Sequence, residues 1–312
     1  MTGPLGPGKV RGLQQLSRDG VFSILALDHR DSLRVELDAA DPDGVAAADL
    51  TRFKLDVLAA VGDRPSGVML DPEYGVVPAI ASGSLDPSVG FLCALEAQGY
   101  LGRPGVTGNE LLDGWSVAKT GRCGASAAKL LVLYRPDGGA VTAAQEELIR
   151  RVVDQCHDHD LALFVEPVPY DIADAADRRR VCLGSAERVA ALGADVVKMP
   201  FPAATDDRAG WDAACADVTA AISVPWAVLS WGVSYEVFRD QVAAACGAGA
   251  SGFMAGRAIW GGVVDSDERA AVVEREVIPR LDELTVIARS QATPWTARTD
   301  IVDPSIWDLS AY

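Results

Sequence analysis

The chain has 312 residues, of which 49% are hydrophobic, and a formal net charge of −16. This length and apolar content can bury a large core, and single-domain α/β barrels commonly have this size. The negative charge would repel phosphate backbones, which argues against nucleic-acid binding. A small anionic substrate is compatible with it, because a local cluster of donors can hold one.

The sequence carries no sign of a membrane or an oxidising environment. No apolar stretch reaches the roughly eighteen residues of a membrane span, and the first residues lack the apolar core of a signal peptide. Six cysteines are scattered without a CxxC pair, which is typical of reduced core thiols. We therefore expect a cytoplasmic protein with no membrane partner.

Short apolar runs alternate with helix-length patterns along the chain. Strands are expected at 22–27, 66–70, 91–95, 128–134, 161–165, 194–198, 225–230 and 252–255. Helices are expected at 45–61, 142–158, 185–192, 208–221, 234–247 and 265–289. This alternation predicts parallel strands with helical crossovers, and eight strands over roughly 250 residues match a (β/α)8 TIM barrel.

A doubly wound open sheet is the alternative fold. It would more often carry a GxGxxG fingerprint after its first strand, whereas Asp28, His29 and Arg30 follow here. We expect one (β/α)8 domain over 1–312, with a short N-terminal extension and a C-terminal tail after about 290.

Polar side chains recur where the predicted strands end, and in a barrel these ends meet at the active site. The residues at this end are Asp28, Asp71, Glu96, Lys129, Glu166, Lys198 and Ser230. A neutral lysine amine can add to a ketone and form an iminium, and a second positive charge nearby favours the neutral amine. Lys198 is therefore a candidate nucleophile, with Lys129 as its cationic neighbour and Glu166 as a proton shuttle.

Each of these residues also has a structural interpretation. Lys198 could be a lysine that extends its amine from a strand end into solvent. Lys129 could form a buried ion pair with Glu166 or Asp28. Asp28 and Asp71 could cap the helices that follow them.

Glycines and a cation follow the last two strands. Ser230 and Gly232 come after the seventh strand, and Gly256 and Arg257 after the eighth. Barrels commonly bind phosphate at this corner through backbone N–H groups and a helix N-terminus. The loop after the first strand offers His29 and Arg30 for a second anion, although Arg30 could instead pair with nearby carboxylates.

The chain resembles the class I tagatose-1,6-bisphosphate aldolases and the related sulfofructosephosphate aldolases. The similar segments are ALDHRDSLR (26–34), LDPEYG (70–75), ALEAQGY (94–100), AAKLLVLY (127–134), FVEPVPYD (164–171), VVKMPFP (196–202), LSWGVS (229–234) and GFMAGRAIW (252–260). The resemblance implies a Schiff base on Lys198, proton transfer by Glu166, a site lined by Lys129 and Asp28, and phosphate binding by Ser230 and Arg257.

Two positions differ from the family pattern. Family members often have Asp-Gln-Arg where His29 stands here, and Ser-Ala-Gly where this chain has Trp231. These differences bear on the identity of the substrate and not on the imine chemistry.

The resemblance implies an aldolase that cleaves a ketohexose 1-phosphate derivative. Tagatose 1,6-bisphosphate is the expected substrate, and sulfofructose 1-phosphate is the alternative. A sugar-phosphate-binding regulator on the same barrel is a more distant alternative, and a carbonyl-trapping assay would distinguish such a regulator from an aldolase.

No cofactor or metal is expected, because the histidines, His29, His157 and His159, form no ligand cluster. A homo-oligomer is compatible with the sequence.

Overall fold

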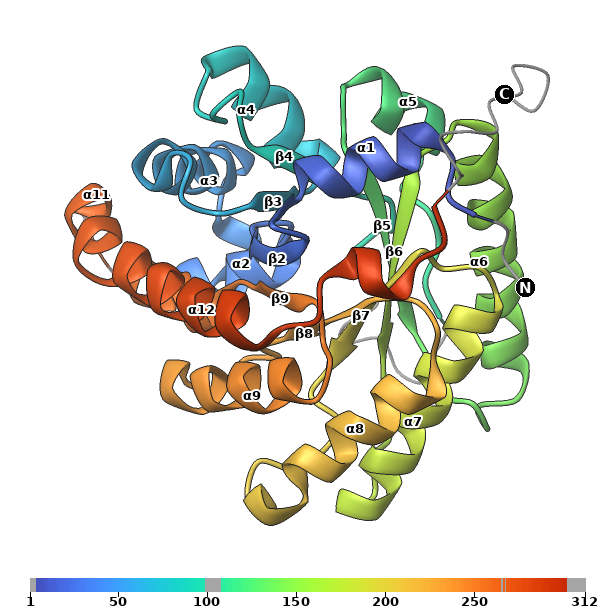
Figure 1. Cartoon of the computed structure of the whole chain (residues 1–312). Coiled ribbons are helices and arrows are strands. Elements are labelled where there is room, and N and C mark those ends of the chain that lie inside the picture. The colour runs from blue at the N-terminus through green and yellow to red at the C-terminus, as the bar shows by residue number, and fades with distance from the viewer. Residues whose placement is uncertain (1–3, 99–107, 265, 267, 302–312) are drawn as a thin grey trace.

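The computed structural model describes residues 4–98, 108–264, 266 and 268–301. Eight parallel strands form a closed barrel, because β2 (Val21–Ala26) pairs with both β3 (Gly67–Leu70) and β9 (Gly252–Ala255). Helices surround the barrel as an outer ring (Figure 1). This closure confirms the predicted (β/α)8 barrel and excludes the open sheet.

The predicted strands are all present, with ends that shift by at most three residues. The strands between β3 and β9 are β4 (Gly90–Ala94), β5 (Ala127–Leu133), β6 (Ala162–Val168), β7 (Val196–Pro200) and β8 (Trp226–Leu229). A short β1 (Ser17–Arg18) pairs antiparallel with β2. Apolar runs of this length are typical of strands buried on both faces, which is why the sequence located them well.

The helices agree with the sequence less closely. The outer helices are α2 (Asp31–Leu37), α3 (Ala47–Val61), α4 (Val77–Ser82), α5 (Val117–Arg122), α6 (Ala140–Asp158), α7 (Ala175–Ala191), α8 (Trp211–Ala221), α9 (Tyr235–Gly247), α10 (Arg257–Trp260), α11 (Arg269–Val272) and α12 (Ile278–Gln291). The expected start of α7 at residue 185 was wrong. Its first turns are rich in Asp and Arg, so they show no apolar periodicity, and Asp174 begins the helix by accepting a hydrogen bond from the backbone of Asp177.

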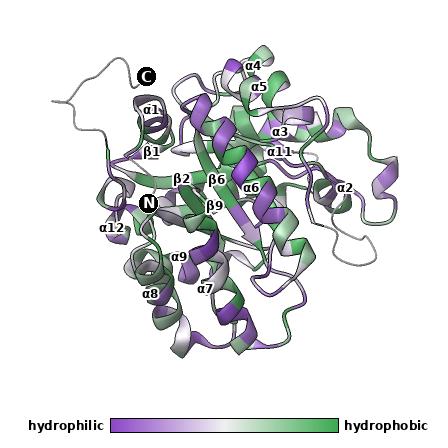
Figure 2. Cartoon of the chain, turned by 90° about the vertical axis from the view of Figure 1, so that its right-hand side faces the viewer, coloured by the Kyte–Doolittle hydropathy of each residue, from purple (hydrophilic) through white to green (hydrophobic). Residues whose placement is uncertain are grey.

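The barrel interior is filled by every second residue of the strands. Ala127 on β5, Phe164 on β6, Val196 on β7 and Met254 on β9 belong to one buried cluster. A second cluster fills the space between the strands and the helices. Figure 2 shows apolar strands inside helices that carry polar residues on their outer faces. Since strand side chains alternate, the next inward positions beyond these apolar residues face the carboxyl end of the barrel.

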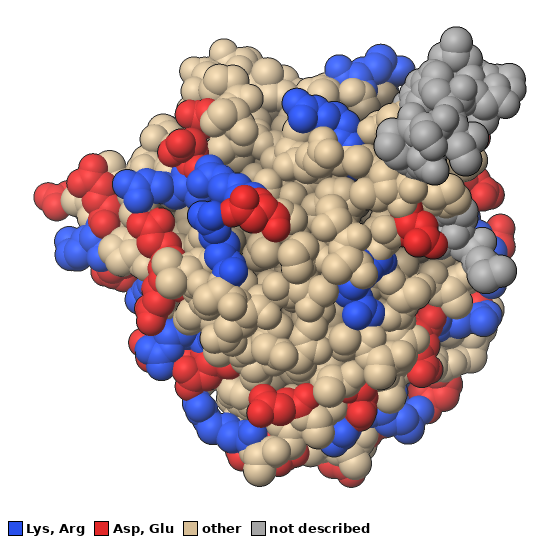
Figure 3. Space-filling view, viewed as in Figure 1, with Lys and Arg blue, Asp and Glu red and all other residues tan. Residues whose placement is uncertain are grey.

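The N-terminal extension closes the opposite end of the barrel. Helix α1 (Pro7–Gln15), absent from the expected elements, places Leu13 in the interior cluster. Lys9 on this helix forms a buried ion pair of 2.9 Å with Asp195. Trp295 of the C-terminal tail packs into the same cluster, so α1 and Trp295 together cover this end of the barrel. Figure 3 views this face and shows charges mainly toward its rim.

None of the helices in the described part of the chain combines the length and the apolar character needed to cross a membrane. The tail was expected to pack over the barrel or against a neighbouring subunit. Its described part, up to Ile301, packs on the barrel, and the rest of the tail lies outside the described residues.

Candidate active site

A cavity of about 190 Å³ opens at the carboxyl end of the barrel. It is lined by Ala26, Asp28, His29, Ser32, Lys129, Leu131, Glu166, Val168, Lys198, Pro200, Leu229, Ser230, Trp231, Gly232, Met254, Gly256 and Arg257. Larger hollows exist on the outer surface, such as one of about 650 Å³ between α8 and α9, but that hollow contains no lysine. The chemistry of the lining, and not the size of the hollow, therefore locates the site.

Lys198 and Glu166 form a pair at the floor of this cavity. Lys198 stands on β7 and Glu166 on the neighbouring β6, and both side chains point inward. The Lys198 Nζ donates a hydrogen bond of 2.8 Å to Oε2 of Glu166. An amine next to a carboxylate, both in contact with a cavity, can exchange a proton with that carboxylate while it reacts with a carbonyl.

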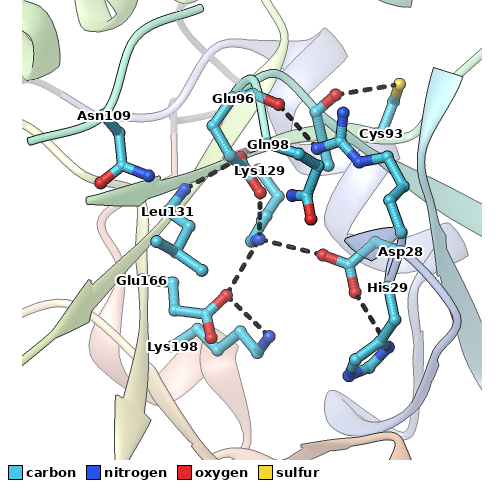
Figure 4. Close-up of polar contacts among 12 residues, drawn as sticks. Asp28, His29, Cys93, Glu96, Gln98, Asn109, Lys129, Leu131, Glu166 and Lys198 are labelled. Atoms are coloured by element: carbon cyan, nitrogen blue, oxygen red, sulfur yellow. Dashed lines mark hydrogen bonds and ion pairs between the residues drawn. The ribbon is translucent and has the colours of Figure 1, made fainter. Parts of the chain in front are cut away.

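Lys129 on β5 lies at the centre of a cluster of carboxylates (Figure 4). Its Nζ lies 2.9 Å from Asp28, 2.6 Å from Glu96 and 3.0 Å from Glu166. Only 1% of its side chain is exposed. The second oxygen of Glu96 accepts a hydrogen bond of 3.1 Å from the backbone N–H of Leu131. The expected ion pairs of Lys129 with Asp28 and Glu166 are therefore both present.

The lysines keep the buried carboxylates ionised. Burial alone would raise the pKa of Glu166, but Lys129 and Lys198 outweigh burial, so its pKa is lowered. Burial also opposes the ionisation of Asp28, yet Lys129, then Lys198 and His29, bring its pKa far below its usual range. The cluster thus places two lysine side chains among carboxylates that stay ionised despite their burial.

His29 borders the same cavity with an imidazole that is neutral at neutral pH. Burial lowers the pKa of His29 to about 4, and the nearby Arg257 and Lys198 act in the same direction, against Asp28. Its ring packs edge-on against Trp260 at 5.1 Å. Its Nδ1 is buried and makes no hydrogen bond within the described part of the chain. This nitrogen lies 3.8 Å from Oδ1 of Asp28, and the neutral imidazole adds no charge to the cavity.

The predicted phosphate corner is brought together by β8 and β9. Ser230, Gly232, Gly256 and Arg257 all border the cavity. A Cβ at Gly256 would lie 2.8 Å from the carbonyl oxygen of Ala26, so only glycine fits there. Arg257 begins α10, is partly exposed, and reaches Glu36 at 3.3 Å. The corner therefore presents a cation and closely approachable backbone to an anion.

Arg30 does not reach the cavity, which differs from the expectation that it binds a second anion. Its guanidinium donates hydrogen bonds to Glu73 at 2.7 Å and to the Glu96 carbonyl at 2.6 Å, and its side chain is only 1% exposed. The other interpretation, a pair with a nearby carboxylate, fits better. Asp71 is likewise structural, since it caps the following turn at Tyr74 and pairs with the buried Lys54.

Sequence reasoning placed Glu96 at a strand end without giving it a role, and it missed Ser32. The signal for Glu96 was present, because it continues the inward alternation of β4. Ser32 carried no such signal, since it lies at the start of α2. Among the described residues, no group of three or more His, Cys, Asp or Glu side chains has the arrangement of a metal site.

The fold and the site together define an aldolase barrel. The sequence profile of the DeoC/LacD family aldolases matches residues 22–262, so the chain belongs to this family. This match confirms the resemblance to the class I tagatose-1,6-bisphosphate aldolases, and the protein is a lyase of the aldolase type.

Curated relatives cover nearly the whole chain. A tagatose 1,6-diphosphate aldolase 2 of Streptococcus pyogenes serotype M3 is 30% identical over 96% of this chain and 100% of its own length. A tagatose 1,6-diphosphate aldolase 1 of serotype M1 is 29% identical over 92% of this chain and 97% of its own length.

Solved structures show the same fold. An archaeal fructose 1,6-bisphosphate aldolase is 21% identical, with a TM-score of 0.63 over 91% of this chain and 99% of its own. A fructose-bisphosphate aldolase from Slackia heliotrinireducens is 17% identical, with a TM-score of 0.64 over 91% of this chain and 90% of its own.

Proposed function

We propose that this protein is a Schiff-base aldolase that uses Lys198 to cleave a ketohexose 1-phosphate derivative, with tagatose 1,6-bisphosphate as the substrate. The observation that best supports Lys198 as the nucleophile is the contrast between the surroundings of Lys198 and Lys129. Both lysines line the cavity, but among the described residues Lys198 pairs with one carboxylate and keeps 7% of its side chain exposed, whereas Lys129 is held by three carboxylates and keeps 1% exposed. Lys198 is thus the amine that a carbonyl carbon can approach.

The cleavage then follows from ordinary imine chemistry. Glu166 takes a proton from the Lys198 ammonium, and the neutral amine adds to the C2 ketone. As a second proton moves from nitrogen to the former carbonyl oxygen, Glu166 gives its proton back to that oxygen, which leaves as water and yields the iminium. The iminium nitrogen takes the electron pair of the C3–C4 bond as this bond breaks, and the proton of the C4 hydroxyl passes to a carboxylate. The three-carbon aldehyde leaves. Protonation of the enamine at C3 and hydrolysis release dihydroxyacetone phosphate and restore the lysine.

The remaining groups hold the substrate in position for these steps. Ser230, Gly232, Gly256 and Arg257 support binding of the C1 phosphate, because they border the cavity beside β7 and so present C2 to the neighbouring lysine. Arg257 can offer two parallel N–H groups to a phosphate. The charge of Lys129, balanced by Asp28 and Glu96, stabilises the ionised carboxylates between which protons move.

Covalent trapping tests this proposal directly. Borohydride reduction in the presence of dihydroxyacetone phosphate should add the mass of the reduced substrate to the peptide that carries Lys198. Lys9, which is also buried beside a carboxylate but at the far end of the barrel, serves as the internal control and should stay unlabelled. A label on Lys129, or no label at all, would contradict the assignment.

The substrate is tested by a separate panel of cleavage assays. Purified protein should cleave tagatose 1,6-bisphosphate faster than fructose 1,6-bisphosphate or sulfofructose 1-phosphate. A preference for sulfofructose 1-phosphate, giving sulfolactaldehyde, would establish the alternative substrate. We also propose that the protein acts in the cytoplasm, and size measurement in solution would test for a homo-oligomer.

A further inference from the structure

Trp231 occupies an unusual backbone conformation at the rim of the catalytic cavity. Its φ is +42°, in the left-handed region that large side chains rarely adopt. It lies between Ser230 and Gly232 of the proposed phosphate corner, and among the described residues its side chain is one of the few large apolar ones on the surface, at 36% exposure. Such a conformation at a cavity rim needs a compensating role or strong local support.

The support comes from Arg178 on α7. The centre of its guanidinium lies 4.6 Å from the centroid of the Trp231 ring. Its Nε and Nη2 both donate to the carbonyl oxygen of Phe201, at 3.1 and 2.8 Å. No ion pair of Arg178 occurs among the described residues, so carbonyl and indole are the groups that hold this cation. Stacking on an aromatic face is the packing that a planar guanidinium favours.

These contacts tell where the indole lies. Phe201 directly follows β7, the strand of Lys198, whereas Trp231 follows β8. Since Arg178 touches both Phe201 and the indole, the ring extends from the end of β8 back toward the end of β7. Trp231 also lines the cavity, as Lys198 does, so the ring lies at the side of the cavity where β7 and β8 end.

The size of the cavity makes this position important. Its volume of about 190 Å³ is below the roughly 300–1,000 Å³ of typical ligand pockets. A hexose derivative anchored at Arg257 and bound to Lys198 must therefore extend its distal carbons past the rim. Apolar Val168 and Pro200 also line the cavity. An indole face accepts C–H groups well.

We propose that Trp231, held in place by Arg178, is a specificity-determining residue that restricts the aldehyde product to an unbranched polyhydroxy chain. This inference rests on the proposed aldolase function. The carbon chain beyond C3 packs against the indole, and branched or aromatic aldehydes collide with it. Arg178 is a positioning residue, because it acts on the substrate only through the ring.

The test measures condensation of dihydroxyacetone phosphate with glyceraldehyde 3-phosphate, isobutyraldehyde and phenylacetaldehyde. Trp231→Gly, which removes the ring and tolerates the left-handed backbone, should raise kcat/KM for the two bulky aldehydes relative to glyceraldehyde 3-phosphate by roughly 10-fold or more. Trp231→Phe should give a smaller shift. Arg178→Met should shift the ratio in the same direction, because the indole loses its support.

A matched control is available elsewhere in the chain. Arg208 lies 4.9 Å from the ring of Trp211 in a similar stack outside the cavity, so Arg208→Met should leave the ratio unchanged. An equal loss or no change for all three aldehydes in Trp231→Gly would overturn the inference. Borohydride trapping of dihydroxyacetone phosphate distinguishes a failure of the proposed aldolase function from a failure of the specificity proposal for Trp231. If the wild type forms an adduct and the ratio does not move, only the specificity proposal fails, whereas a wild type without an adduct overturns the proposed function and this inference with it.

Discussion

The two ends of the barrel both bury a lysine beside carboxylates, yet they are built differently. At the closed end, Lys9 pairs among the described residues with Asp195 alone, and Asp195 also accepts a hydrogen bond from the backbone N–H of Leu163 at 2.8 Å. At the open end, Lys129 and Lys198 share one carboxylate, because Glu166 contacts both amines. The closed end is covered by α1, and the open end borders a cavity.

This contrast shows that a buried lysine is not by itself a mark of function. An ion pair that is matched one to one and covered by a helix serves to satisfy its own charges. A carboxylate that contacts two amines next to a cavity can exchange a proton with either amine. The less enclosed amine, that of Lys198, stays within reach of a substrate. The following predictions test this difference, from the largest expected effect to the smallest.

Replacing the nucleophile should have the largest effect on catalysis. Lys198→Arg keeps the positive charge beside Glu166 but cannot form an imine, so cleavage should fall by roughly 10⁴-fold or more. Steady-state kinetics and mass spectrometry after borohydride treatment measure this loss. Lys9→Arg is the control at the closed end and should keep its turnover. Substantial activity in Lys198→Arg would show that another group forms the covalent bond.

Removing the shared cation should weaken the fold as well as the reaction. Lys129→Met leaves Asp28, Glu96 and Glu166 without their common partner, so the free energy of unfolding should fall by about 3–5 kcal/mol. Lys9→Met should cost a similar amount because it strands Asp195. Urea unfolding compares the two variants. The distinguishing result is turnover of the folded fraction, which should drop for Lys129→Met and stay normal for Lys9→Met.

Removing the proton shuttle should slow turnover by roughly 10²-fold, as expected for general acid–base groups. Glu166→Gln keeps the shape of the side chain and can still accept a hydrogen bond from Lys198. Circular dichroism should show an intact fold. If turnover is unchanged, Glu166 serves only as an ion-pair partner, and the open end would then resemble the closed end.

The pH dependence of stability should carry a contribution from His29. Burial lowers its pKa to about 4 in the folded protein, against an ordinary value of 6.5. Between these values the unfolded chain binds a proton that the folded protein does not, so stability falls as the pH drops through this window. His29→Gln should make the unfolding free energy depend less steeply on pH from 6.5 to 4. An unchanged slope would mean that His29 is charged in the folded state.

Chelation should have the smallest effect of all. An iminium already provides the electron sink for bond cleavage, so activity should survive prolonged treatment with a chelator. The measurement is turnover before and after dialysis against the chelator. Loss of activity that zinc restores would point to a different mechanism at the open end.

The sequence alone determined the strands and the side of each strand that carries function. Buried strands read as short apolar runs, and the two-residue alternation places Lys129 two positions beyond Ala127, on the same inner face. Since parallel strands end together in a barrel, the polar residues that follow the inner apolar ones had to gather at one mouth. Lys198, Glu166 and Asp28 were predictable for this reason.

Only the tertiary structure decided which partner each of these side chains takes. Arg30 turns away from the mouth to Glu73, and α1 reaches across the barrel to pair Lys9 with Asp195. The support of Trp231 by Arg178 joins the loop after β8 to the start of α7. Such contacts join residues far apart in the chain, and their distances depend on how the barrel closes and on side-chain rotamers, which no local pattern records.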